Sequence, residues 1–296
     1  MPGRDRPFFG YEDETQSVSD WVPTQSVGTR GFSYPCHPCH PWLNFMRNLK
    51  LVLSYDGTEF NGWQTQPGFR TVQETLEKAI HALTREKVHA NASGRTDAGV
   101  HAVGQVINFY SNTPYTTEVL VRALNAHLPP DVVVREAQEV PQAFDANRDA
   151  RRKLYRYVIH DGPVPDPFLR RYCHQSRHRL DVEAMRRAAE PLRGRHDFHS
   201  FETDWPNRMS SVRNITHLTV NRAGDWIWLD VEADGFLYNM VRAIAGTLMN
   251  VGRGYWPPSQ VDQILQAEDR RLAGPTAPAQ GLFLVRVTYE GMRDEG

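Results

Sequence analysis

The segment Gly94-Arg95-Thr96-Asp97-Ala98-Gly99-Val100-His101-Ala102 holds the residues of this sequence that are best suited to chemistry. It places one carboxylate, Asp97, two residues after Arg95 and between two glycines. Glycines in such a segment permit positive φ angles or a close approach of the backbone to a ligand. An aspartate that a turn presents beside a cation can stay ionised, as a nucleophile or general base requires. The alternative is a structural turn in which Asp97 caps a helix or pairs with Arg95.

Strands and a helix are predicted on both sides of this segment. Residues 88–93 before it are expected to form a short strand and a turn, and residues 103–110 after it form a longer strand. Upstream, Thr71 followed by Glu74 three residues later has the pattern of a capping box at a helix N-terminus. One face of that helix carries an apolar stripe, Val72, Leu76, Ile80 and Leu83. A rigid strand-and-helix framework is therefore expected to hold Asp97.

Strands and helices mix in both halves of the chain. Alternation of side chains predicts strands over 49–55 and 154–160, and the apolar run 132–134 predicts a buried strand. Further strands are predicted over 215–220, 226–231 and 282–289. Helical spacing predicts helices over 118–127, 182–192 (ended by Gly194), 237–251 and 261–267. In the strand 154–160, Tyr155 and Tyr157 share one face. The pattern predicts an α+β fold with two sheet-and-helix lobes.

The composition is that of a globular protein with an uneven charge distribution. The net charge is −1 and 40% of the residues are hydrophobic, but no apolar run approaches the ~20 residues of a membrane span. Three cysteines argue against a disulfide framework and favour a reducing cytoplasm. Residues 147–195 hold thirteen Lys/Arg and six Asp/Glu, a local charge of +7. This run predicts a basic face for phosphates, or else a solvated surface offset elsewhere.

Residues 1–45 lack the periodicity of the rest and are expected to be a disordered extension, translated from a start codon upstream of Met46. They have neither the apolar core of a secretory signal nor the acid-poor composition of a transit peptide. Cys36-His37-Pro38-Cys39-His40 matches the haem-attachment pattern and carries enough thiols and imidazoles for zinc. Haem attachment requires export, and zinc sites usually draw their ligand pairs from separate segments. Both metal interpretations are therefore disfavoured.

The Asp97 segment resembles the signature of the tRNA pseudouridine synthases of the TruA type. Further motifs follow in the family's order over residues 47–291: Tyr55-Asp56-Gly57-Thr58, Gly62-Trp63-Gln64, Thr71 to Glu77, Lys153-Leu154-Tyr155-Arg156-Tyr157, Asp197-Phe198-His199-Ser200-Phe201, Met240-Val241-Arg242-x-x-x-Gly246 and Gly281 to Val285. The resemblance implies the pseudouridine synthase fold, in which two similar lobes of antiparallel sheet plus helices enclose a central cleft. It divides the chain into the extension 1–45, a catalytic lobe 46–150 and a C-terminal lobe 151–296. It also implies a homodimer, while the cysteine count and the lack of a long apolar run predict a cytoplasmic protein without a membrane association.

The same resemblance implies the isomerisation of uridine to pseudouridine at positions 38, 39 and 40 of the tRNA anticodon arm. Asp97 matches the catalytic aspartate, and Arg242 matches the arginine that pairs with it. Whether such a carboxylate attacks the base or C1′ stays open. The reaction includes no redox step and no net hydrolysis, so neither a metal nor a redox cofactor is needed.

Three further residues are assigned to the substrate by the resemblance. Tyr155 matches the tyrosine that stacks on the uracil and helps to remove the C5 proton. Arg95 fills the space left by the flipped base, and Leu282 packs against the base pocket. The alternatives are strand-core roles for Tyr155 and Leu282, an Arg95–Asp97 ion pair, and a surface position for Arg242. A charge within an otherwise apolar helix, however, is normally paired.

Phosphate contacts are expected beside Tyr155, from the basic run of Arg148, Arg151, Arg152, Lys153 and Arg156. Asn147 departs from the family pattern, which has an arginine there, and this puts one phosphate contact in doubt. Three alternatives compete with the enzyme: an inactive RNA-binding relative, a metal or haem protein built on Cys36 to His40, and a pseudouridine synthase of another family. Retention of Asp97, Tyr155 and Arg242 together argues against the inactive relative.

Overall fold

The computed structural model describes residues 46–203 and 210–291. The expected extension 1–45, with its cysteine and histidine cluster at Cys36 to His40, lies outside these residues. Among the helices of the described ranges, none has the length and apolar content needed to cross a bilayer.

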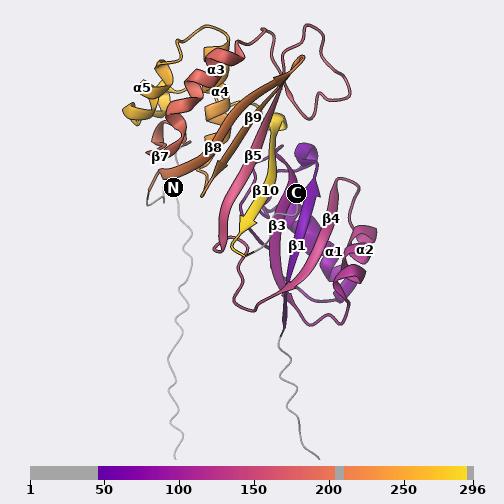
Figure 1. Cartoon of the computed structure of the whole chain (residues 1–296). Helices are drawn as coiled ribbons and strands as arrows, with labels where there is room; N and C mark the ends of the chain where they lie inside the picture. The colour runs from indigo at the N-terminus through magenta and orange to yellow at the C-terminus, as the bar shows by residue number, and fades with distance from the viewer. Residues whose placement is uncertain (1–45, 204–209, 292–296) are drawn as a thin grey trace, which may run out of the picture. The chain divides into compact units, whose positions relative to one another are not determined.

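A ten-stranded sheet forms the framework, with the strand order β4-β1-β3-β10-β5-β9-β8-β7, while β2 pairs with β3 and β6 with β5 (Figure 1). The strands are β1 (Arg47–Tyr55), β2 (Asn91–Ala92), β3 (His101–Ser111), β4 (Val132–Val140), β5 (Ala150–His160), β6 (His174–Gln175), β7 (Gly194–Asp197), β8 (Val212–Ala223), β9 (Trp226–Ala233) and β10 (Leu282–Tyr289). Leu49, Leu51 and Leu53 of β1 are fully buried. Their spacing of two puts them on one face, as the alternation predicts.

The last strand joins the two halves of the sheet. β10 runs parallel to β3, with Phe283 opposite His101, and antiparallel to β5, with Leu284 opposite Tyr155. The C-terminal strand therefore lies between the strand that follows the Asp97 segment and the strand that carries Tyr155. The predicted α+β fold, with two sheet-and-helix lobes whose sheets join, is confirmed.

Helices cover each half of the sheet. α1 (Val72–Thr84) packs against α2 (Thr117–His127), which contacts β4; α3 (Val182–Ala189) packs against α4 (Met240–Gly252) and β8, and α5 (Gln260–Ala267) contacts α3 (Figure 1). Eleven of the 13 residues of α4 are buried. This helix is therefore core around most of its circumference, and its one arginine is held in a mostly apolar setting.

Two predicted helix ends and the capping box were wrong. Thr71 precedes α1, but its side chain makes no capping hydrogen bond, and Glu74 instead pairs with Lys78 at 2.7 Å. α3 ends at Ala189 and a 3₁₀ turn, η2 (Glu190–Leu192), follows. Pro191 explains this end, because proline lacks the amide that an α-helix interior needs. α4 begins at Met240 and not at residue 237, because Asn239 is left-handed.

Candidate active site

The loop between β2 and β3 presents Asp97 and is anchored on the end of β1 and on the segment that follows this strand. The Trp63 amide donates to the Thr96 carbonyl at 3.0 Å, and the Gly99 amide donates to the Phe60 carbonyl at 3.2 Å. The Tyr55 hydroxyl and Thr96 Oγ1 lie 2.8 Å apart in a buried hydrogen bond. Gly99 has φ +77°, which a residue with a Cβ adopts only at a cost. These bonds fix the turn that carries the carboxylate.

Asp97 forms an ion pair with Arg242, near the start of α4. Arg242 Nη1 lies 3.3 Å from Asp97 Oδ2, and the two side chains are 17% and 24% exposed. Arg242 also donates from Nε to the Ala277 carbonyl at 2.7 Å and from Nη1 to Asn239 Oδ1 at 2.8 Å. Burial raises the pKa of Asp97, and the guanidinium beside it offsets part of that rise. The surface position considered for Arg242 is therefore wrong.

Arg95 is exposed and has no ion pair or hydrogen bond to a side chain within the described parts of the chain. The alternative of an Arg95–Asp97 ion pair is therefore wrong, because Asp97 takes its hydrogen bond from Arg242. The Arg95 guanidinium stays available to a ligand.

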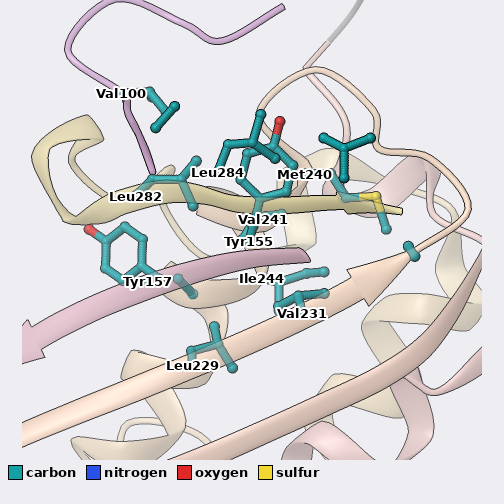
Figure 2. Packing of buried hydrophobic residues seen from close by; sticks show 14 of the residues in the cluster. Val100, Tyr155, Tyr157, Leu229, Val231, Met240, Val241, Ile244, Leu282 and Leu284 are labelled. Carbon is teal, nitrogen blue, oxygen red and sulfur yellow. The ribbon is translucent and has the colours of Figure 1, made fainter. Parts of the chain in front are cut away.

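Tyr155 and Leu282 come from neighbouring strands. Tyr155 is 7% exposed and Leu282 is 5% exposed, and both belong to a buried cluster with Val241 and Leu284 (Figure 2). The Phe236 ring meets the Tyr155 ring edge-on, with centroids 4.9 Å apart. Burial raises the pKa of Tyr155, with smaller contributions from Tyr55 and Asp97. The phenol is therefore protonated at neutral pH.

Tyr157, two residues along the same strand, is a core residue as expected. Its side chain is fully buried, and its hydroxyl donates to the Pro278 carbonyl at 2.8 Å. The two tyrosines lie on the same face of β5, but Tyr155 lines the cavity whereas Tyr157 packs in the core.

One cavity of about 960 Å³ brings four of the five predicted site residues together: Arg95, Asp97, Tyr155 and Leu282. Arg242 is not among its lining residues but contacts the cavity wall through Asp97. The lining comes from both halves of the chain, including residues 89–92, Lys153 and residues 236–241. Asn147, the departure from the family pattern, also lines it. The volume is within the range of ligand pockets.

The basic run beside Tyr155 is largely neutralised by acidic partners. Each arginine of the run forms a salt bridge with an acidic residue: Arg148 with Asp149, Arg151 with Glu290, Arg152 with Glu232 and Arg156 with Asp230. Lys153 differs, because its Nζ donates to the Ser93 carbonyl and it lines the cavity. Burial lowers the pKa of Lys153 to about 8, with a smaller effect of Arg213. Of the predicted basic run, Lys153 is thus the cation that faces the cavity.

Asn239 and Phe236 were missed from sequence. Both precede the Met240-Val241-Arg242 motif. The helix predicted over 237–251 includes Asn239, and a position inside a helix gives its side chain no part in the site. The residue type of Asn239 could have indicated its conformation, because asparagine adopts a left-handed backbone more readily than any residue except glycine. Within residues 46–203 and 210–291, no group of three or more His, Cys, Asp or Glu is placed to hold a metal ion.

The sequence profile of the family described as tRNA pseudouridine synthase matches residues 51–147 and 188–290. Over 244 residues the chain is 46% identical to tRNA pseudouridine synthase A of Acetivibrio thermocellus, which covers 82% of this chain and 100% of that relative. The chain belongs to the tRNA pseudouridine synthase family. Proteins of the same name from Thermoanaerobacter sp. and Moorella thermoacetica are 45% and 47% identical, over 82% and 81% of this chain and 100% and 99% of theirs.

Membership of the tRNA pseudouridine synthase family agrees with the enzyme class expected from the motifs, an isomerase. The profile match includes Arg95 and Asp97 in its first part and Arg242 and Leu282 in its second, while Tyr155 lies between the two parts. The cavity therefore combines residues from both matched regions with one from the intervening strand.

Proposed function

We propose that this chain isomerises uridine to pseudouridine at positions 38, 39 and 40 of the tRNA anticodon arm, with Asp97 as the nucleophile. The observation that carries the proposal is the Asp97–Arg242 pair at the wall of a cavity that Tyr155 also lines. The choice of substrate rests on family membership, on the relatives named tRNA pseudouridine synthase A and on the TruA-type motif at residues 94–102.

The proposed reaction needs no group beyond these side chains and the RNA. The bond from uracil N1 to ribose C1′ breaks, C5 bonds to C1′, the C5 proton leaves and N1 takes a proton, so atoms and charge balance. The nucleophile must be ionised when it attacks. Arg242 favours the ionised form of Asp97 against the effect of burial.

The cavity offers a place for a flipped base. Tyr155 stacks on the uracil, an interaction worth ~1–3 kcal/mol per base, and Leu282 packs against its edge. Arg95, an exposed residue of the cavity lining, fills the gap left in the RNA stack, so the duplex stays open during chemistry. Lys153 supplies a cation for a nearby phosphate.

We also propose that residues 46–150 form the catalytic lobe and residues 151–296 the second lobe, and that the enzyme acts as a homodimer in the cytoplasm. The lobes are supported by the sheet order, in which β4, β1 and β3 lie on one side of β10 and β5, β9, β8 and β7 on the other. The dimer rests on the family resemblance and the compartment on the low number of cysteines. Sedimentation of the purified protein tests the dimer.

The test is tritium release from tRNA that carries 5-tritiated uridine, because pseudouridine formation expels the C5 hydrogen. Wild type is compared with Asp97→Asn, on transcripts that keep a uridine at 38, 39 or 40 alone. Release by wild type and none by the variant supports reaction and nucleophile. No release by folded wild type leaves an RNA-binding relative without activity. Release that survives in the variant moves the nucleophile away from Asp97.

A further inference from the structure

Asn239 has an unusual backbone directly before α4. Its φ and ψ are 62° and 6°, and only two other non-glycine residues of the described chain, Arg85 and Glu268, have a positive φ. A non-glycine residue in this region costs on the order of 1 kcal/mol or more and persists only where its surroundings hold it. Such residues cluster at functional sites, where the surrounding contacts hold the strained backbone in place.

The side chain of Asn239 makes two hydrogen bonds with fixed roles. Its Oδ1 accepts from Arg242 Nη1 at 2.8 Å, and its Nδ2 donates to Thr203 Oγ1 at 3.0 Å. A guanidinium only donates, so the amide oxygen must face Arg242 and the amide nitrogen must face Thr203. The orientation of the amide is thereby determined by its partners.

The far end of this connection is Thr203, which follows the Asp197-to-Phe201 motif by two residues. The 3₁₀ turn η3 (His199–Phe201) leads to Thr203, whose amide donates to the Tyr238 carbonyl at 3.1 Å while its hydroxyl accepts from Asn239. Backbone and side chain of Thr203 therefore both hold the segment before α4. Thr203, which is not among the cavity-lining residues, is thus connected to Arg242 through Asn239.

We propose that Asn239 is a positioning residue that holds the Arg242 guanidinium toward Asp97. Arg242 has three oxygen partners, and those at Ala277 and Asn239, at 2.7 and 2.8 Å, are closer than Asp97 at 3.3 Å. The two neutral oxygens therefore set where the cation lies, and the carboxylate meets it there. The catalytic consequence rests on the proposed function, but the geometry can be tested without it.

The charge state of Asp97 reports the position of Arg242. The other cations and the histidine that line the cavity with Asp97 are Arg95, Lys153 and His89. Within the described residues, Arg242 alone forms an ion pair with Asp97. If Arg242 moves away from Asp97, its charge no longer offsets the effect of burial, and the pKa of Asp97 rises.

The first test is an NMR titration of the Asp97 carboxyl carbon, assigned with Asp97→Asn. Asn239→Ala is expected to raise the pKa by about half to one unit, since an opposite charge within ~4–6 Å lowers a carboxyl pKa by about 1–3 units. Asn250→Ala is the matched control, because Asn250 accepts from Arg253 at 3.4 Å with the same spacing at the other end of α4. An unchanged pKa in Asn239→Ala overturns the proposal.

Asn239→Gly separates the hydrogen bond from the backbone strain. Glycine adopts the left-handed conformation freely but offers no side-chain oxygen. We expect the same rise in the Asp97 pKa as in Asn239→Ala. A wild-type pKa in Asn239→Gly would show that only the backbone matters and would overturn the proposal.

A double-mutant cycle tests whether Asn239 acts through Arg242. Asn239→Ala is expected to lower kcat for tritium release about ten- to hundredfold in the wild-type background. In Arg242→Lys the loss should be much smaller, because this variant lacks the guanidinium that Asn239 holds. Equal losses in both backgrounds would overturn the proposal. If wild type releases no tritium, the proposed function fails, while the titration of Asp97 still decides the role of Asn239.

Discussion

Asp97 Oδ2 accepts its hydrogen bond from Arg242 Nη1 at 3.3 Å, across 145 residues of sequence. Within the described chain this is the only hydrogen bond that the Asp97 side chain accepts. Its other oxygen, Oδ1, accepts no hydrogen bond there. A carboxylate whose oxygens were all occupied by strong donors would be a poor nucleophile. The geometry therefore combines a cation that favours ionisation with one oxygen left for the substrate.

Removal of the cation is expected to displace the acidic limb of the rate profile. Burial already raises the pKa of Asp97 and Arg242 opposes this, so Arg242→Met raises that pKa further. The ionised fraction then falls at a given acidic pH, and the limb of kcat against pH moves upward by about one unit or more. Tritium release measured from acidic to neutral pH checks this, with Arg253→Met, directly after the C-terminal end of α4, as control. An unmoved limb with reduced kcat would mean that Arg242 does not set the charge of Asp97.

Tyr155→Phe and Tyr155→Ala are expected to separate the ring from the hydroxyl. Phenylalanine keeps the stacking surface, so KM for tRNA changes little, while alanine loses ~1–3 kcal/mol of stacking and raises KM about ten- to hundredfold. Both variants are expected to lower kcat, because both lose the hydroxyl to which the family resemblance assigns a part in removing the C5 proton. Steady-state tritium release measures the two constants.

Tyr157→Phe is the control for this pair of variants. It removes the hydrogen bond to Pro278 in the core, so we expect a loss of about 1 kcal/mol in the free energy of unfolding and an unchanged kcat. If Tyr155→Phe raised KM as far as Tyr155→Ala does, the hydroxyl and not the ring would be the main contact with the base.

Affinity for tRNA is expected to fall as the pH rises through the region of the Lys153 pKa. That pKa is lowered to about 8, so the free enzyme carries the charge below this pH and loses it above. A phosphate binds the charged form, so KM rises on the alkaline side. Lys153→Arg should flatten the rise, because guanidinium stays charged. Lys78→Arg, in the exposed pair with Glu74, should leave the wild-type profile unchanged, and a rise in KM that persists in Lys153→Arg would exclude Lys153 as its source.

Gly246→Ala is expected to destabilise the protein and to disturb Arg242. A Cβ at this position would lie 1.8 Å from the Pro275 carbonyl oxygen, so the segment up to Ala277, which accepts from Arg242, must shift. We expect a loss of about 1–3 kcal/mol in the free energy of unfolding, measured by denaturant titration, and a lower kcat.

Gly252→Ala is the matched control in the same helix. There the Cβ would meet Met185 Sδ at 2.8 Å, which is part of a flexible side chain that can move. Its loss should be smaller. Equal losses in the two variants would show that backbone contact at Gly246 has no special importance.

Local patterns predicted a large part of the fold, whereas the family resemblance supplied the candidate site residues, whose roles stay predictions. Burial of Leu49, Leu51 and Leu53 follows from alternation, and the Asp97 segment follows from its residue types. The errors lie where a side chain had a choice of partners. Glu74 pairs with Lys78 and not with the helix N-terminus, and Asn239 leaves the helical conformation that its apolar neighbours favour.

The sequence by itself marked the candidate residues for the chemistry: Asp97 through the residue types around it, and the others through motifs that follow the order of the resembled family. Only the tertiary structure decided which charges meet. The Arg156–Asp230 pair forms because β5 and β9 align these two residues, and β10 lies between β3 and β5, so the Asp97 loop and Tyr155 share one cavity. Strand order and register bring together residues that are far apart in the chain. The pairing of Asp97 with Arg242 rather than Arg95 therefore depends on the packing of distant elements, and no local pattern contains it.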